Sequence, residues 1–256
     1  MKFFTPVVTN EYQQRLTVLA DRLDVYTRKY EAAKDSRAIF SCTYTNITLV
    51  LANGLTDETF RDPQWIVSLA EIFAGYYFRA LDAEDEKREV PAAWKKVFDT
   101  IRFNNSSVLE DMVFAMTAHI VHDLPFALVD AGRTNEDETS HIHDFHQMND
   151  ILAANVQVIE DAVLSRYAPF LSWLDHLEKG YDQILSNYGF RLSRGMAWYN
   201  ADRLLDPHSK AEAERSIIRS VEIFIDNVRR PSILSVRIFF WFARFIVGLC
   251  RRWPKN

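Results

Sequence analysis

The sequence contains few of the residues that interrupt helices, with seven glycines and eight prolines among 256 residues. These residues shape tight turns, so their scarcity disfavours a sandwich or barrel with many short strands. Apolar residues make up 48% of the chain, which is enough to bury a large core. We therefore expect an all-α protein that folds as a single-domain, compact multi-helix array.

Cysteine is also scarce, because Cys42 and Cys250 are the only two. They lie far apart and form no CxxC pair, which excludes a cysteine-based zinc site and a disulfide framework. No Gly-x-Ser-x-Gly motif indicates a serine nucleophile. The first ten residues lack the sustained apolar run of a secretory signal. We expect a cytoplasmic protein that begins at Met1.

The chain has no excess of positive charge, because 35 Asp and Glu outnumber 30 Lys and Arg, and the formal net charge of -5 argues against a nucleic-acid partner. The C-terminal segment differs, because residues 229–256 carry seven Lys and Arg and no acidic residue. We divide the chain into a helical core domain, 1–230, and a basic, aromatic-rich C-terminal helix, 231–256. Aromatic residues surround this helix, which favours docking on the core. Peripheral membrane contact through a helix at the lipid interface is the alternative.

Apolar residues recur at three- and four-residue intervals through most of the chain, and this period predicts helices. Pro63 and Pro91 stand where helices begin, and Asn53-Gly54 stands where one ends. Residues 41–51 are rich in Thr, Ile and Val and also suit a strand, but we expect a helix. The predicted helices cover residues 11–33, 41–51, 65–81, 91–101, 109–122, 141–167, 170–187, 192–205, 209–229 and 233–252.

Histidine is concentrated in one region, because five of the seven histidines fall between residues 119 and 146. Side chains three and four positions apart share a face of a helix, so His119, His122 and Asp123 form one triplet. Pro125 marks a kink or a helix end beside it. A second triplet of the same residue types follows: His143, His146 and Asp150.

Imidazole nitrogens and carboxylate oxygens suit zinc, iron or manganese, so we predict that the two triplets converge on a divalent metal ion. Such an ion activates a bound water and polarises a phosphoryl or carbonyl oxygen, and Asp144 is the candidate catalytic base. Arg191 and Arg194 are candidate substrate-binding residues because guanidinium groups bind phosphate and carboxylate. These residues favour a metal-dependent hydrolase acting on phosphoester or lipid-like substrates.

A second hypothesis gives these residues no catalytic role. Buried histidines are often structural, and arginines near many acids often form surface ion pairs. The chain would then be a non-catalytic helical binding protein with an apolar pocket. Its partner would be a small hydrophobic or lipid-like molecule, or a partner helix.

The chain contains the motifs Ala118-His119-Ile120-x-x-Asp123-Leu124-Pro125, Asp144-Phe145 with Asn149, Phe60-x-Asp62-x-x-Trp65, Phe73-x-x-Tyr76 and Arg194-x-x-Ala197-Trp198. Together these motifs resemble the bacterial domain of unknown function 5995 family. The resemblance spans roughly residues 10 to 205 and implies no function, because that family has no established activity.

The His-x-x-x-Asp pairs, His119 with Asp123 and His146 with Asp150, are similar to ligand pairs of the zinc-dependent phospholipase C and single-strand nuclease superfamily. That more distant resemblance implies an all-helical zinc enzyme. The chain departs from the pattern because no histidine precedes His119. A reduced metal site is therefore the most that the resemblance implies.

Overall fold

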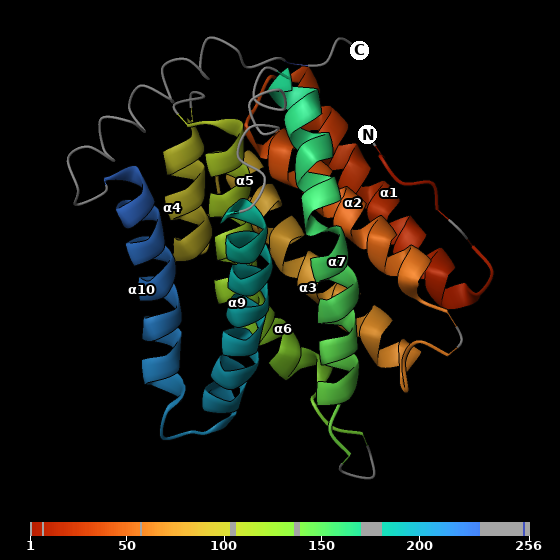
Figure 1. Ribbon diagram of the computed structural model, residues 1–256. Coiled ribbons are helices and arrows are strands. Elements are labelled where there is room, and N and C mark those ends of the chain that lie inside the picture. Colours follow the sequence, from red (N-terminus) through yellow and green to blue (C-terminus); the bar gives the residue numbers. More distant parts are fainter. Residues whose placement is uncertain are drawn as a thin grey trace.

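The computed structural model describes residues 2–6, 8–56, 58–102, 106–135, 139–169, 181–230 and 253, without the side chains of 181–188. Helices make up the regular structure of these ranges, and an isolated bridge joins Thr134 to Ser140. Figure 1 shows the helices packed side by side in one array. The expected all-α fold is confirmed.

The helices follow the predicted order closely. Their bounds are α1 Glu11–Ala32, α2 Arg37–Gly54, α3 Pro63–Asp85, α4 Ala92–Ile101, α5 Val108–Thr117, the π-helical turn η2 Ala118–Asp123, α6 Leu124–Ala131, α7 Ile142–Tyr167, α9 Tyr181–Leu205 and α10 Lys210–Arg229. The predicted break between residues 187 and 192 is wrong, because α9 runs through it. Gly189 is tolerated there, since one glycine inside a helix costs only about 1 kcal/mol. Predicted helices at 170–180 and 233–252 lie outside the described residues.

Capping side chains set the points at which helices begin. Asp62 accepts a hydrogen bond of 2.9 Å from the Trp65 amide, and Pro63 occupies the first turn of α3. Ser107 and Glu110 form a reciprocal capping box at the start of α5. Each cap satisfies amides that have no partner inside the helix, so the local sequence fixes these boundaries.

Helix α2 lies at the centre of the array and is buried over most of its length. Its hydroxyl groups do not compete with the helix, because each donates to the carbonyl four residues earlier: Ser41, Thr43, Thr45 and Thr48. These bonds satisfy polar groups that burial would otherwise penalise. Burial therefore overrides the strand propensity of residues 41–51.

One continuous stretch, Val108–Ala131, is long and apolar enough to cross a membrane by length and composition. It joins α5, η2 and α6, and 61% of its most apolar window is buried inside the fold. A core helix of a globular array has the same composition, so this stretch is weak evidence for a membrane span. The buried residues Asp111 and Asp123 lie within it.

The C-terminal segment, 231–256, lies outside the described residues except for Trp253. The Trp253 ring lies 6.1 Å from the Tyr167 ring at an interplanar angle of 72° and packs against the main core. Docking of the whole segment and contact with a membrane both stay predictions.

Close packing between α2 and α7 gives a stability prediction. A Cβ atom at Gly54 would lie 2.8 Å from Cγ2 of Ile151, whereas one at Gly75 would meet only the tip of Arg79 at 3.6 Å. We expect Gly54→Ala to destabilise the fold by about 1–3 kcal/mol through overpacking. We expect the control Gly75→Ala to stabilise α3 by about 0.5–1 kcal/mol. Urea unfolding followed by circular dichroism measures both, and equal effects would contradict the close approach.

Candidate binding site

The carboxylate of Asp123 is buried at the centre of the molecule, with 1% of the residue exposed. Its Oδ2 atom accepts hydrogen bonds from Trp94 Nε1 at 2.8 Å and lies 2.9 Å from His119 Nδ1, while Oδ1 lies 2.8 Å from His122 Nδ1. Burial alone raises the pKa of Asp123, but the contacts with the two histidines outweigh it, so the pKa is below its usual value. Asp123 is therefore an ionised carboxylate with three N–H donors.

Aromatic rings enclose the imidazole of His119. The ring stacks on Phe73 with 3.6 Å between centroids and an interplanar angle of 7°, and it meets the edge of Tyr44 at 4.6 Å. Burial lowers the pKa of His119, so the ring is neutral near pH 7 and donates its Nδ1 proton to Asp123. Its buried Nε2 atom has no hydrogen-bond partner among the described residues.

The π-helical turn Ala118–Asp123 carries this arrangement. A π-helical turn contains more residues than an α-helical turn, and such turns often occur at functional sites. Here it allows both His119 and His122 to reach the one carboxylate of Asp123. Pro125 follows in the first turn of α6, where its missing N–H is tolerated. The predicted irregularity beside the first triplet is therefore a π-helical turn within a continuous helical path.

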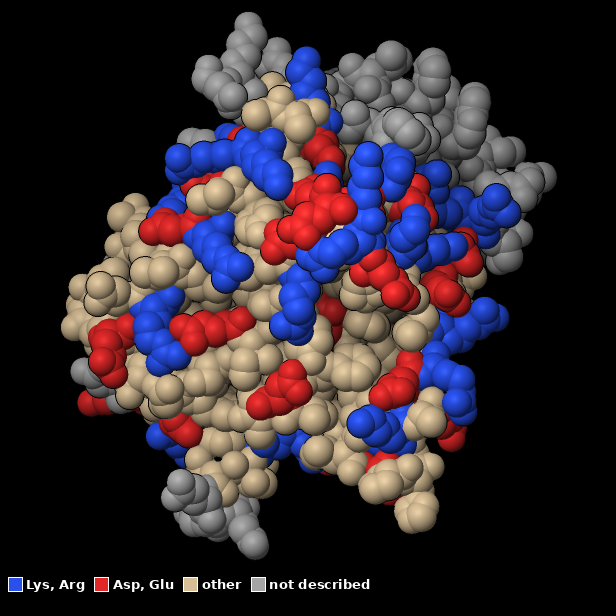
Figure 2. Space-filling model, turned by 180° about the vertical axis from the view of Figure 1, so that it is seen from behind, with Lys and Arg blue, Asp and Glu red and all other residues tan. Residues whose placement is uncertain are grey.

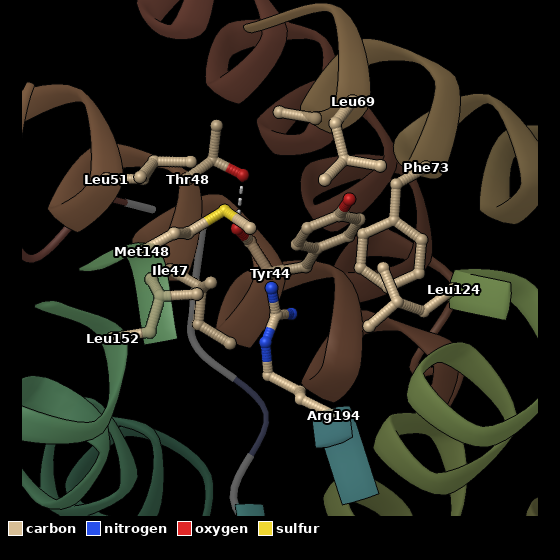
Figure 3. Close-up of a pocket in the computed structure, with 11 residues that line it drawn as sticks. Tyr44, Ile47, Thr48, Leu51, Leu69, Phe73, Leu124, Met148, Leu152 and Arg194 are labelled. Atoms are coloured by element: carbon tan, nitrogen blue, oxygen red, sulfur yellow. Dashed lines mark hydrogen bonds between the residues drawn. The ribbon is translucent and has the colours of Figure 1, made fainter. Parts of the chain in front are cut away.

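Asp123 with Trp94, His119 and His122 forms what we call the Asp123 cluster. An apolar pocket lies beside it, and Arg194 is the one charged side chain among the described residues that line this pocket. Figure 3 shows Arg194 extending from α9 with its guanidinium group toward Tyr44. The cavity volume is about 40 Å³. The lining residues come from α2, α3, α6, α7 and α9: Tyr44, Ile47, Thr48, Leu51, Leu69, Ala70, Phe73, Leu124, Met148, Leu152 and Arg194.

Arg194 is 3% exposed, yet no carboxylate pairs with it in the part of the chain that the structure describes. Its Nε donates to Oδ1 of the neutral Asn149, and its Nη2 has no hydrogen-bond partner there. The rings of Phe145 and Phe190, at 4.9 and 5.6 Å, offset part of the cost of burying the charge. Burial lowers the pKa of Arg194 to about 10, so the group stays charged at neutral pH.

Comparison with known proteins places this chain in a family. Residues 16–230 match the model described as "Family of unknown function (DUF5995)". The chain belongs to this family. No curated protein and no solved structure shows significant similarity to it. The suggested distant likeness to zinc-dependent phospholipases and nucleases has no support in these comparisons.

The two predicted triplets of this DUF5995 protein lie in different environments. His119 and Asp123 are buried, whereas His143, His146 and Asp150 are exposed. Asp150 forms an ion pair with Arg191 at the surface. Among the residues that the structure describes, no group of three or more His, Cys, Asp or Glu side chains is arranged to hold a metal ion. The metal site and its ligands stay a prediction.

Asp144, the candidate catalytic base, is buried and connects α7 to the turn before α3. Its two oxygens accept hydrogen bonds from the amides of Arg61 at 3.0 Å and Asp62 at 2.7 Å. His143 Nδ1 lies 3.4 Å from the same carboxylate. Contacts of this kind hold the turn before α3 in place against α7.

The sequence pattern placed Arg194 among the candidates but did not identify the pocket. Asn149, which orients Arg194, appeared only within a family motif, and the apolar lining was not singled out. One signal was present: Phe190, Arg194, Ala197, Ala201 and Leu204 recur at helical spacing, and all are buried. A charged residue at a core position of such a stripe indicates a special environment.

The Asp123 cluster gives a second prediction. Asp123→Asn keeps the shape but presents an NH2 group to N–H donors, so we expect the free energy of unfolding to fall by about 3 kcal/mol or more. The control Asp150→Asn alters an exposed ion pair and should change it by less than about 0.5 kcal/mol. Urea unfolding of the wild-type protein and the two variants tests this. A loss in Asp123→Asn as small as that in Asp150→Asn would show that the buried contacts contribute little to stability.

Proposed function

We propose that this protein binds a small amphiphilic anion in the pocket beside Arg194. The charged group of the ligand accepts a hydrogen bond from the guanidinium group, and the apolar part contacts the side chains from α2, α3 and α7. The observation that carries the proposal is the buried, charged guanidinium of Arg194, whose Nη2 atom has no partner among the described residues. This is the binding-protein hypothesis with an anionic group added to its ligand.

The cost of the buried charge supports this role. An isolated buried charge is unfavourable unless it is paired or fully hydrogen-bonded. Asn149 supplies only one neutral oxygen, which orients the guanidinium group without cancelling its charge. A bound anion would complete the pairing, so the fold keeps a charge whose stabilisation depends on a ligand.

The size and lining of the cavity also fit such a ligand. A volume of about 40 Å³ exceeds the roughly 10–15 Å³ that one water molecule needs. It is small for a whole lipid, so it suits the charged end of a molecule and the first part of its chain. Leu51, Leu69 and Met148 supply apolar contacts for that chain.

Binding of octyl-chain anions tests the proposal. Isothermal titration calorimetry with octanoate, octyl sulfate and octyl phosphate should detect binding of at least one to the wild-type protein. Arg194→Met keeps the apolar stem and removes the charge, so we expect affinity to fall about tenfold or more, as for loss of a charge-assisted hydrogen bond. Asn149→Asp should also weaken binding, because the new carboxylate pairs with Arg194.

The matched control is Arg191→Met on the same helix, which removes an exposed arginine paired with Asp150 and should leave affinity unchanged. Circular dichroism verifies that each variant is folded. Equal binding to the wild-type protein and to folded Arg194→Met would overturn the proposal.

A metal-dependent hydrolase is the second candidate, and the Asp123 cluster supports it. Metal-binding imidazoles are commonly oriented by a carboxylate on their other nitrogen, as Asp123 orients His119 and His122. In that arrangement Asp123 holds the ligands in place, and the histidine Nε2 atoms are the ligands. The exposed His143, His146 and Asp150 would have to approach them, which the described structure does not show.

Metal analysis of protein purified without a His-tag tests this second candidate. We expect about one zinc, iron or manganese ion per chain after growth in metal-replete medium, and its loss in His122→Asn. The control His208→Asn alters an exposed histidine outside both triplets. Wild-type protein that is folded but free of metal would contradict the hydrolase and leave the anion-binding proposal intact.

A further inference from the structure

The pocket offers very little polar chemistry besides Arg194. Its other polar lining side chains are Thr48, whose hydroxyl already donates to the Tyr44 carbonyl at 2.9 Å, and Tyr44 itself. Figure 3 shows the guanidinium group of Arg194 surrounded by aliphatic, thioether and aromatic groups. Terminal oxygens of a ligand that do not reach Arg194 would therefore be buried against apolar atoms, which is unfavourable.

The charges near the pocket also limit what can bind there. Arg194 is the single positive charge of the described lining, and His119 behind Phe73 is neutral near pH 7. Burial raises the pKa of Tyr44, the ionised Asp123 raises it further, and Arg194 acts in the opposite direction. A ligand with two negative charges would have one cation to pair with and would be repelled by the nearby Asp123, whose charge reaches the pocket wall at Tyr44.

From these two limits we infer that the ligand is a monocarboxylate with an apolar chain, and not a phosphate or sulfate ester. This inference rests on the proposed function and names its ligand class. A carboxylate brings one charge, which Arg194 neutralises, and two oxygens. A phosphate ester brings a second charge, and a sulfate ester brings a third terminal oxygen.

The arrangement of Arg194 is consistent with this class. Its Nε–H group is used by Asn149, so the side-on fork of Nε and Nη2 is not available as a pair. A carboxylate oxygen can instead accept from Nη2, which has no partner among the described residues.

Ranking ligands of equal chain length tests the inference. Calorimetry with octanoate, octyl sulfate and octyl phosphate near pH 8, where the phosphate ester carries about two charges, compares charge and shape at a constant apolar chain. We expect octanoate to bind about tenfold or more tightly than either ester. Hexanoate and decanoate, with the matching esters, repeat the ranking at other lengths. Arg194→Met should remove the preference for the carboxylate.

The outcomes separate the inference from the function on which it rests. If an ester binds as tightly as the carboxylate at every chain length and loses affinity in Arg194→Met, the carboxylate class is wrong and the anion site remains. If no anion depends on Arg194, the proposed function fails as well. Preference for octanoate in the wild-type protein but not in Arg194→Met supports both.

Discussion

Asp123 and Arg194 are both buried in this helical array, and they differ in their hydrogen-bond partners. Asp123 has three N–H partners, from Trp94, His119 and His122. Arg194 has a neutral amide oxygen on one nitrogen and no partner on another within the described structure. Because the cost of a buried charge depends on its pairing, the first charge is stabilised within the fold, and the second is the one for which we propose a ligand.

Charged side chains on the surface differ from these buried ones, because they are solvated and lie close to charges of opposite sign. Figure 2 shows basic and acidic side chains intermingled across one face of the molecule. Exposed pairs such as Lys95 with Asp99 and Arg102 with Glu84 contribute little, because water screens them and long side chains lose entropy. Net charge and surface pairs therefore say little about function here. The informative charges are the few that burial isolates from water.

Helical period and capping residues predicted most of the fold, because both depend on neighbours in sequence. Asp62-Pro63 and Asn53-Gly54 mark helix ends that the structure confirms. The break predicted between residues 187 and 192 is wrong because α9 continues through Gly189, whose cost inside a helix is small. The histidine spacing joined His119 to Asp123 correctly. It could not show that the second triplet faces solvent. Spacing tells which residues lie on the same face of a helix, but not whether that face is buried.

The Asp123 cluster packs against the wall of the pocket, although Asp123 itself does not line the pocket. The carboxylate fixes the tautomer and orientation of His119, whose ring stacks on Phe73 and meets Tyr44. Those two aromatic residues form part of the pocket wall beside Arg194. A binding site needs contacts that hold its lining side chains in one conformation. Here the Asp123 cluster supplies such contacts to Phe73 and Tyr44 through the ring of His119. Among the polar residues of the family motifs, His119 and Asp123 support this wall and Arg194 lines the pocket. Asp62 and Asp144 instead fix the turn before α3.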